Sequence, residues 1–191
     1  MLHFNELYRF GELFKRGATR VDFEPHPAFR YWIAIQCGRE RPEPPLRVRE
    51  ITGKRPYDVV GSTILLHLVS PRLRTALRSG GITGWDTLSV DTGSFALIRG
   101  YEVLRILGRC GPIDDSQSER VILPPPTKSG RAVDGWRGLY FDPVSWDGSD
   151  IFGPPETGHI FMTKRTADLV RQMKPSNASL EPLPAIERLV L

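Results

Sequence analysis

An apolar run that ends in a helix-start signal occurs twice in this chain, and it limits the folds that the chain can adopt. Residues 64–69 are apolar except for one histidine and end in Ser70-Pro71, where serine suits the N-cap and proline the first helical position. About 93 residues later, residues 160–162 lead into Thr163, which can cap a helix in the same way. Both segments therefore predict a strand followed directly by a capped helix.

The two predicted helices carry narrow apolar stripes. Apolar residues recur at helical spacing in residues 71–79, before Gly80-Gly81, and in residues 164–173, before Pro175. Such stripes are too narrow for an all-helical bundle. We therefore predict one α+β domain over residues 1–191, with a mixed sheet of several short strands and two related strand, helix, strand units.

Other strands follow from β-branched and aromatic content or from alternation. They are predicted at residues 31–35, 46–51, 85–90 and 101–107. Residues 124–130 contain three consecutive prolines and predict a surface loop. The chain contains 18 Gly and 17 Pro, which favours many turns between short elements.

Composition narrows the class of protein. No N-terminal signal-like segment and no apolar run long enough to span a membrane is present in the sequence, so we expect a cytoplasmic protein. Cys37 and Cys110 are then expected as free thiols. Neither has a second cysteine or a histidine at the short spacing that a zinc site needs, so we expect no metal and no cofactor. Residues 1–110 carry 17 Lys/Arg against 11 Asp/Glu, whereas residues 111–191 carry 9 against 11.

An acidic, aromatic stretch runs from Asp134 to Glu156. Aromatic residues within an acidic rim suit an interface for a basic partner, because the rings anchor and the carboxylates steer the encounter. The surface candidates in this stretch are Trp136, Asp142, Asp147, Asp150 and Glu156. Within it, Gly148 between two aspartates predicts a tight turn, flanked by Trp146 and Phe152, which we expect in the core.

Two other interpretations use different residues. Asp147, Asp150 and His159 can be read as the acid and base groups of a small hydrolytic enzyme, but capping of a turn explains the aspartates better. The arginine-rich N-terminal half and the basic residues of both predicted helices can be read as a nucleic-acid surface. We rank that below a solvated helix face, because no helix-turn-helix spacing or aromatic RNA-binding box accompanies the charges.

The turn and its helix resemble a family of bacterial immunity proteins, the antidotes encoded beside polymorphic, contact-delivered toxins. The resemblance rests on the sequence Trp-Asp-Gly-Ser-Asp-Ile-Phe at residues 146–152, followed by the Thr163-Lys164-Arg165 helix start, and it extends over residues 57–191. It includes a strand at residues 138–142 and says little about residues 1–56. A sister group carries two Cys-x-x-Cys-Gly motifs, of which only Cys37-Gly38 and Cys110-Gly111 stand here, so the resemblance implies no metal.

The resemblance implies a protein that binds a co-encoded toxin and occludes it, without chemistry of its own. Small size and the acidic, aromatic stretch fit that expectation, whereas the formal net charge of +4 fits it less well. We therefore expect a cognate protein toxin as the partner, contacted by the acidic half of the chain.

Overall fold

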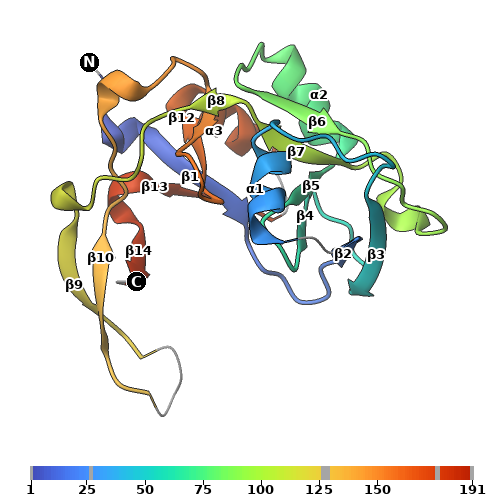
Figure 1. Cartoon of the computed structure of the whole chain (residues 1–191), viewed down its shortest axis with the longest axis horizontal. Coiled ribbons are helices and arrows are strands. Elements are labelled where there is room, and N and C mark those ends of the chain that lie inside the picture. The colour runs from blue at the N-terminus through green and yellow to red at the C-terminus, as the bar shows by residue number, and fades with distance from the viewer. Residues whose placement is uncertain (1, 26–27, 126–129, 175–176, 190–191) are drawn as a thin grey trace.

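The fold is mixed α+β, as the sequence predicts. The computed structural model describes residues 2–25, 28–125, 130–174 and 177–189, and within this part of the chain it has three α-helices and fourteen strands (Figure 1). The helices are α1 (Phe29–Gln36), α2 (Pro71–Ser79) and α3 (Lys164–Gln172). The second and third confirm the predicted helices, α3 ending one residue earlier than expected.

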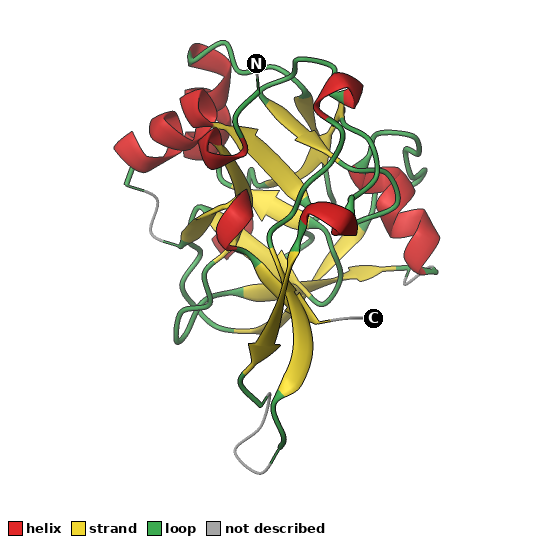
Figure 2. Cartoon of the chain, turned by 90° about the vertical axis from the view of Figure 1, so that its left-hand side faces the viewer, coloured by secondary structure: helices red, strands yellow, loops and turns green. Residues whose placement is uncertain are grey.

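The described strands form three sheets. The six-stranded sheet has the order β3 (Arg47–Thr52), β2 (Arg20–Glu24), β4 (Val59–Ser62), β5 (His67–Val69), β7 (Glu102–Ile106), β6 (Trp85–Leu88). The five-stranded sheet has the order β13 (Ala178–Pro182), β1 (Leu7–Glu12), β12 (Ile160–Thr163), β11 (Ile151–Gly153), β8 (Gly108–Arg109). The third contains β14 (Glu187–Leu189), β10 (Val133–Arg137) and β9 (Glu119–Leu123), of which β9 and β10 project from the body as an arm (Figure 2).

The two larger sheets repeat one topology. The order β2-β4-β5-β7-β6 corresponds to β8-β11-β12-β1-β13, and in each set the first pair is parallel and the other pairs are antiparallel. The helix α2 connects β5 to β6, and α3 connects β12 to β13. In both units a further strand, β7 or β1, lies between the two strands that the helix connects. The strand, helix, strand units predicted from the sequence thus share an arrangement.

The strand β1 comes from the opposite end of the chain to the rest of its unit. It pairs with β12 through Leu7 and Thr163 and with β13 through Phe10 and Leu180. In the other unit the corresponding strand β7 is the next strand after β6 along the chain, beyond the 3₁₀ turn η2 (Ala96–Ile98). The N-terminal segment, about which the resemblance says little, therefore completes the sheet that contains the tryptophan turn.

The helices α2 and α3 begin at the same polar arrangement. In the first unit, the Ser70 amide donates to the Asp58 carbonyl at 2.9 Å, and the Ser70 hydroxyl donates to the Asp58 carboxylate at 2.7 Å. In the second unit, Thr163 makes the same pair of bonds to Asp150, at 2.9 and 3.2 Å. Both hydroxyl oxygens also accept an amide of the first helical turn, which confirms Ser70 and Thr163 as the predicted N-caps.

An arginine two residues after each cap completes the arrangement and joins the two helices. Arg72 binds the Asp58 carboxylate and also donates to the Met173 carbonyl, at the end of α3. Arg165 binds the Asp150 carboxylate and also donates to the Gly80 carbonyl, at the end of α2. The start of each helix thus satisfies a carbonyl at the end of the other, where the helix dipole favours a cation.

The hydrophobic core connects the two units. One cluster of buried side chains contains Val69 and Leu73 from the first unit together with Met162 and Val170 from the second. A second cluster surrounds Trp32, and a third surrounds Phe141, Phe152 and Phe161 beneath the tryptophan turn. Because the first cluster draws on both sheets and both helices, apolar burial couples the two units.

The predicted strand at residues 31–35 is wrong, because these residues form most of α1. Tertiary packing outweighs the strand propensity of these residues. Trp32 and Ile35 lie one helical turn apart and are both buried, and Trp32 packs against Phe23 of β2. A signal for the helix was present in the sequence at its C-terminal end, where Gly38 follows. Gly38 has a φ of 71°, and its amide and that of Arg39 donate to carbonyls of the last helical turn, which is a glycine C-terminal motif.

Other predicted segments differ in extent. The buried strand predicted at residues 64–69 shortens to β5, because the Ser62 hydroxyl binds the carbonyls of Ile64 and Leu66 and holds a turn there. Residues 138–142, a strand in the resemblance, lie outside every described strand, since Gly138 has a φ of 99° and ends β10. The strands predicted at 46–51, 85–90 and 101–107 are confirmed as β3, β6 and β7. The predicted loop at 124–130 falls partly outside the described residues.

The Asp150 arrangement yields a prediction about stability. Asp150→Ala should lower the free energy of unfolding by about 2–3 kcal/mol, because partly buried donors on two segments, those of Thr83, Thr163 and Arg165, lose their acceptor. Asp58→Ala should have a similar effect. Asp168 provides the control, because its side chain is 38% exposed and its ion pairs among the described residues are with Lys164 and Arg171 on its own helix: Asp168→Ala should change stability by less than about 1 kcal/mol. Urea unfolding measures all three, and equal effects at Asp150 and Asp168 would contradict the account.

Candidate functional site

Two segments of the chain run side by side on the tryptophan-turn side of the five-stranded sheet. Residues 109–118 and 138–147 are joined along their length, from Arg109, whose carbonyl accepts the Asp147 amide, to Ser118, whose hydroxyl donates to the Gly138 carbonyl. Between these ends the Asp114 amide donates to the Tyr140 carbonyl at 2.8 Å. We call this pair of segments the acidic strip.

Three carboxylates of the acidic strip are fixed by the same local bond. One oxygen of Asp114, Asp142 or Asp147 accepts the amide two residues further on, at 3.0, 3.0 and 2.9 Å respectively. This is the Asx turn, and it confirms the capping role expected for Asp147. Asp147 also accepts the Arg109 amide at 2.7 Å. Asp142 and Asp147 are exposed and Asp114 is partly exposed, yet these bonds hold each carboxylate in one orientation, so little side-chain entropy would be lost on binding a partner.

The negative charge of these three groups is not neutralised within the described residues, where none of them forms an ion pair. Hydrogen bonds from Gln117 and Ser116 hold the pKa of Asp114 below its usual value, so this group is ionised at neutral pH. Arg109 directs its guanidinium to the carbonyls of Cys37 and Gly108, and Arg188 pairs with Asp115 rather than with any of the three. The strip therefore presents negative charge on a protein with a net charge of +4.

An apolar side chain protrudes from the strip between Asp142 and Asp147. Val144 lies in the 3₁₀ turn η4 (Pro143–Ser145) and is 90% exposed, the highest value among the large apolar side chains described. Its neighbour Trp146 is half-buried and packs on Phe152, and the indole nitrogen donates to the Ser149 carbonyl at 3.0 Å. Phe152 is buried, as expected, whereas Trp146 covers the edge of the core rather than filling it.

The residues proposed from the sequence do not form one surface. Asp142 and Asp147 lie in the strip, and the turn at Gly148 is confirmed by its φ of 85°. Asp150 is 9% exposed, and its carboxylate accepts bonds from Thr83, Thr163 and Arg165. Burial therefore removes Asp150 from the surface candidates. Trp136 lies on the arm, where its ring stacks with the Arg120 guanidinium at 4.4 Å.

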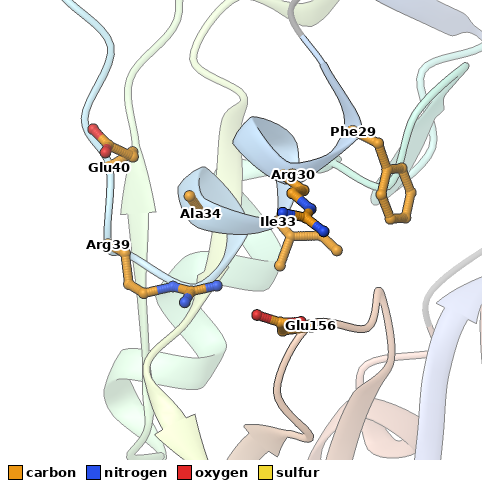
Figure 3. A pocket seen from close by; sticks show the side chains of 7 residues that line it. All are labelled: Phe29, Arg30, Ile33, Ala34, Arg39, Glu40 and Glu156. Carbon is orange, nitrogen blue, oxygen red and sulfur yellow. The ribbon is translucent and has the colours of Figure 1, made fainter.

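Glu156 lies at the other end of β11 from the tryptophan turn, beside a separate pocket. The pocket has a volume of about 380 Å³ and lies between α1, the loop after it and the β11–β12 loop. Arg30 and Arg39 extend toward the same space from one side, and Glu156 faces it from the other (Figure 3). Glu156 has a φ of 57° and forms no ion pair with either arginine in the described contacts. Opposite charges offset each other here, so the pocket favours no ligand class by charge.

The groups required by the hydrolytic interpretation are not assembled. Asp150 lies beside Thr163 at one end of the β11–β12 hairpin, and His159 lies beyond Ile160 at the other end. Burial, with smaller effects of Arg9 and Arg188, lowers the pKa of His159 to about 4, which makes it a poor base at neutral pH. Among the described residues, no group of three or more His, Cys, Asp or Glu is close enough to hold a metal ion.

The helix surface expected for the nucleic-acid interpretation is largely self-neutralised. Arg74 forms an ion pair with Glu102, and Lys164 and Arg171 with Asp168. Arg72 and Arg165 bind the two buried aspartates described above. Few cations of α2 and α3 remain for phosphates, which weakens this interpretation.

Both cysteines are free thiols, as expected, and burial raises the pKa of Cys110 to about 12. In the part of the chain that the structure describes, no helix has the length and apolar character needed to cross a membrane.

Asp114 and Val144 were not predicted from the sequence as surface candidates. Asp114 belongs to an Asp-Asp-Ser sequence, and Val144 follows Asp142-Pro143, and both patterns favour an Asx turn. What the sequence lacked was the pairing of the two segments, which joins residues that are about 30 positions apart. A comparison of the chain with protein-family models and with curated protein sequences finds no match.

The position of His159 gives a prediction about pH. Because its folded-state pKa lies below the unfolded value, the unfolded chain takes up the proton first, and stability falls as the pH drops from about 6.5 to about 4. This group should contribute a loss of about 3 kcal/mol over that interval. His159→Phe, which keeps a ring stacked on Phe161, should reduce the loss of stability by that amount in urea unfolding at pH 7 and 4. An unchanged difference between the two pH values would show that the ring is not held neutral.

Proposed function

We propose that this protein is a cytoplasmic immunity protein that binds a co-encoded bacterial toxin and neutralises it by occlusion, without catalysis. The observation that carries the proposal is the acidic strip, in which Val144 protrudes among three carboxylates held by Asx turns. An apolar anchor with a fixed polar rim is the arrangement expected at the centre of a specific protein interface.

Charge supports a basic partner surface. The strip carries three unneutralised carboxylates, so it attracts a basic protein despite the positive net charge of the whole molecule. The resemblance at the tryptophan turn supports the same function, because that turn forms the end of the strip. A stable interface needs about 1,600 Å² of buried surface in total, so a partner must extend beyond Val144 and its three aspartates. The arm, which continues directly from both segments of the strip, provides adjoining surface.

The two other functions have weaker support. A hydrolytic enzyme would require Asp147, Asp150 and His159 to converge, and Asp150 is engaged in holding α3. A nucleic-acid-binding module would require free cations on α2 and α3, most of which are paired. Occlusion requires only a surface and a rigid body beneath it.

Removing the negative charge of the three aspartates while keeping their Asx turns tests whether the strip binds the toxin. Asparagine keeps the oxygen that accepts the amide in an Asx turn, so the triple variant Asp114→Asn/Asp142→Asn/Asp147→Asn should stay folded. Its unfolding temperature should fall modestly, because the second Asp147 oxygen, which accepts the Arg109 amide, is replaced by an NH2 group. Its affinity for the toxin encoded by the neighbouring gene should fall roughly tenfold to a hundredfold, chiefly through slower association. Isothermal titration and stopped-flow mixing measure both quantities.

Asp91 provides the matched control, because it accepts the Gly93 amide in an Asx turn of the same kind on a different loop. Asp91→Asn should leave toxin affinity unchanged. If the triple variant and the control bind equally well, the strip is not the interface. If the neighbouring gene encodes no toxin that the wild-type protein binds, the proposed function itself is wrong.

A second variant tests the apolar anchor. Val144→Arg places a bulky cation at a site that is almost fully exposed, so the variant should fold with wild-type stability. A basic partner would meet both a steric clash and a like charge, and neutralisation of the toxin in a growth assay should be lost. Val144→Ala should weaken binding only modestly. Full protection by the arginine variant would place the toxin elsewhere.

A further inference from the structure

A second surface, on a different part of the molecule, combines exposed apolar side chains with uncompensated positive charge. It is formed by the loop between β1 and β2 and by the end of β3 with the residues after it, both at the lower side of the body in Figure 1. The Gly17 carbonyl accepts the amides of Lys54 and Arg55, each at 3.2 Å, and Ala18 forms a bridge with Arg55. We call residues 13–19 and 51–55 the loop patch.

The apolar part of the loop patch is unusually exposed. Leu13 is 52% exposed, Phe14 69% and Ile51 45%. Isolated exposed apolar residues need no explanation, but here three large ones lie on two adjoining segments. The guanidinium carbon of Arg20 lies 5.9 Å from the centroid of the Phe14 ring. A surface of this kind is suited to burial against an apolar phase.

The charged part of the loop patch is entirely basic. Its cations are Lys15, Arg16, Lys54 and Arg55, and neither segment of the patch contains an acidic residue. None of the four forms an ion pair within the described residues, and the one contact described for their side chains places the Lys15 ammonium over the Tyr57 ring. Two acids flank the patch in the sequence: the Glu12 side chain is largely buried beside Arg20, whereas Glu50 is exposed, so four cations stand against one exposed carboxylate. The patch therefore keeps its positive charge in the folded protein.

We propose that the loop patch binds the surface of an anionic lipid bilayer. The basic side chains lie close to the headgroup phosphates, while Leu13, Phe14 and Ile51 enter the boundary between headgroups and acyl chains. Two of these three anchors are aliphatic, and aliphatic side chains cannot stack with bases, so a bilayer fits the patch better than single-stranded nucleic acid does. Binding at the surface needs no helix that crosses the membrane.

This inference is independent of the proposed function. The loop patch and the acidic strip share no residue, and the two surfaces have opposite charge. A protein bound to a bilayer through the patch would keep the strip open to a toxin that has just been delivered across that membrane. Loss of lipid binding would leave the strip's affinity for the toxin unchanged in solution, so the two proposals can fail separately.

Co-sedimentation of the full chain with vesicles tests the proposal. The protein should bind vesicles of phosphatidylcholine with added phosphatidylglycerol, should not bind vesicles of phosphatidylcholine alone, and should be released by salt. Lys15→Gln/Arg16→Gln removes two cations and should weaken binding roughly twenty- to thirtyfold. Leu13→Ser/Phe14→Ser should weaken binding with the charge unchanged. Circular dichroism melting checks that these exposed substitutions leave the protein folded.

Two matched controls separate the patch from general surface effects. Arg41→Gln/Arg99→Gln removes the same charge from exposed positions outside the patch, and Ile122→Ser removes an apolar side chain that is 70% exposed on the arm. Both should bind vesicles as the wild type does. Failure of the wild type to bind anionic vesicles, or equal losses in the controls and the patch variants, would overturn the proposal. So would tight binding of a single-stranded oligonucleotide that competes with the vesicles and survives Leu13→Ser/Phe14→Ser.

Discussion

The carboxylate of Asp150 is the point on which the candidate surface depends. It accepts the Thr83 amide from the segment after α2, the Thr163 hydroxyl at the start of α3 and the Arg165 guanidinium. Three segments that are distant in sequence therefore meet at one buried anion, which is stable there because its lone pairs are satisfied. Asp150 lies between the tryptophan turn and β11, so these bonds also fix the end of the acidic strip.

The backbone beside Asp150 adds a steric constraint. A side chain at Gly84 or Gly108 would place its Cβ 2.1 or 2.3 Å from the Ile151 carbonyl oxygen, so both positions require glycine. The Ile151 amide donates to the Thr83 carbonyl at 3.0 Å, which holds the turn against the segment before β6. The strip thus rests on close backbone contacts as well as on hydrogen bonds, and this explains how exposed carboxylates can keep one orientation. A rigid surface of this kind suits a protein that acts by occupying another.

Local signals in the sequence were sufficient to predict α2, α3 and much of the β-structure, but they did not predict α1 or how the elements pack together. Ser70-Pro71 and Thr163 mark helix starts because a capping side chain satisfies amides of its own first turn. The segment around Trp32 misled the prediction, since its strand propensity is outweighed by packing against β2 and by the glycine that ends the helix. The hydrogen-bond partners of Asp58 and Asp150 lie up to about 70 residues away in the sequence, and a local pattern cannot predict contacts at that separation. For the same reason the sequence suggested a contact role for Asp150, and only the fold shows that it is buried.

The central claim is that the acidic strip is the surface covered by the toxin. Hydrogen exchange measured by mass spectrometry, on the protein alone and with the product of the neighbouring toxin gene, tests it without any substitution. We expect exchange to slow in residues 109–118 and 138–147 and to stay unchanged in α2 and α3, which lie outside the strip. Protection confined to the helices or to the arginine-bearing N-terminal half, with none in the strip, would contradict it.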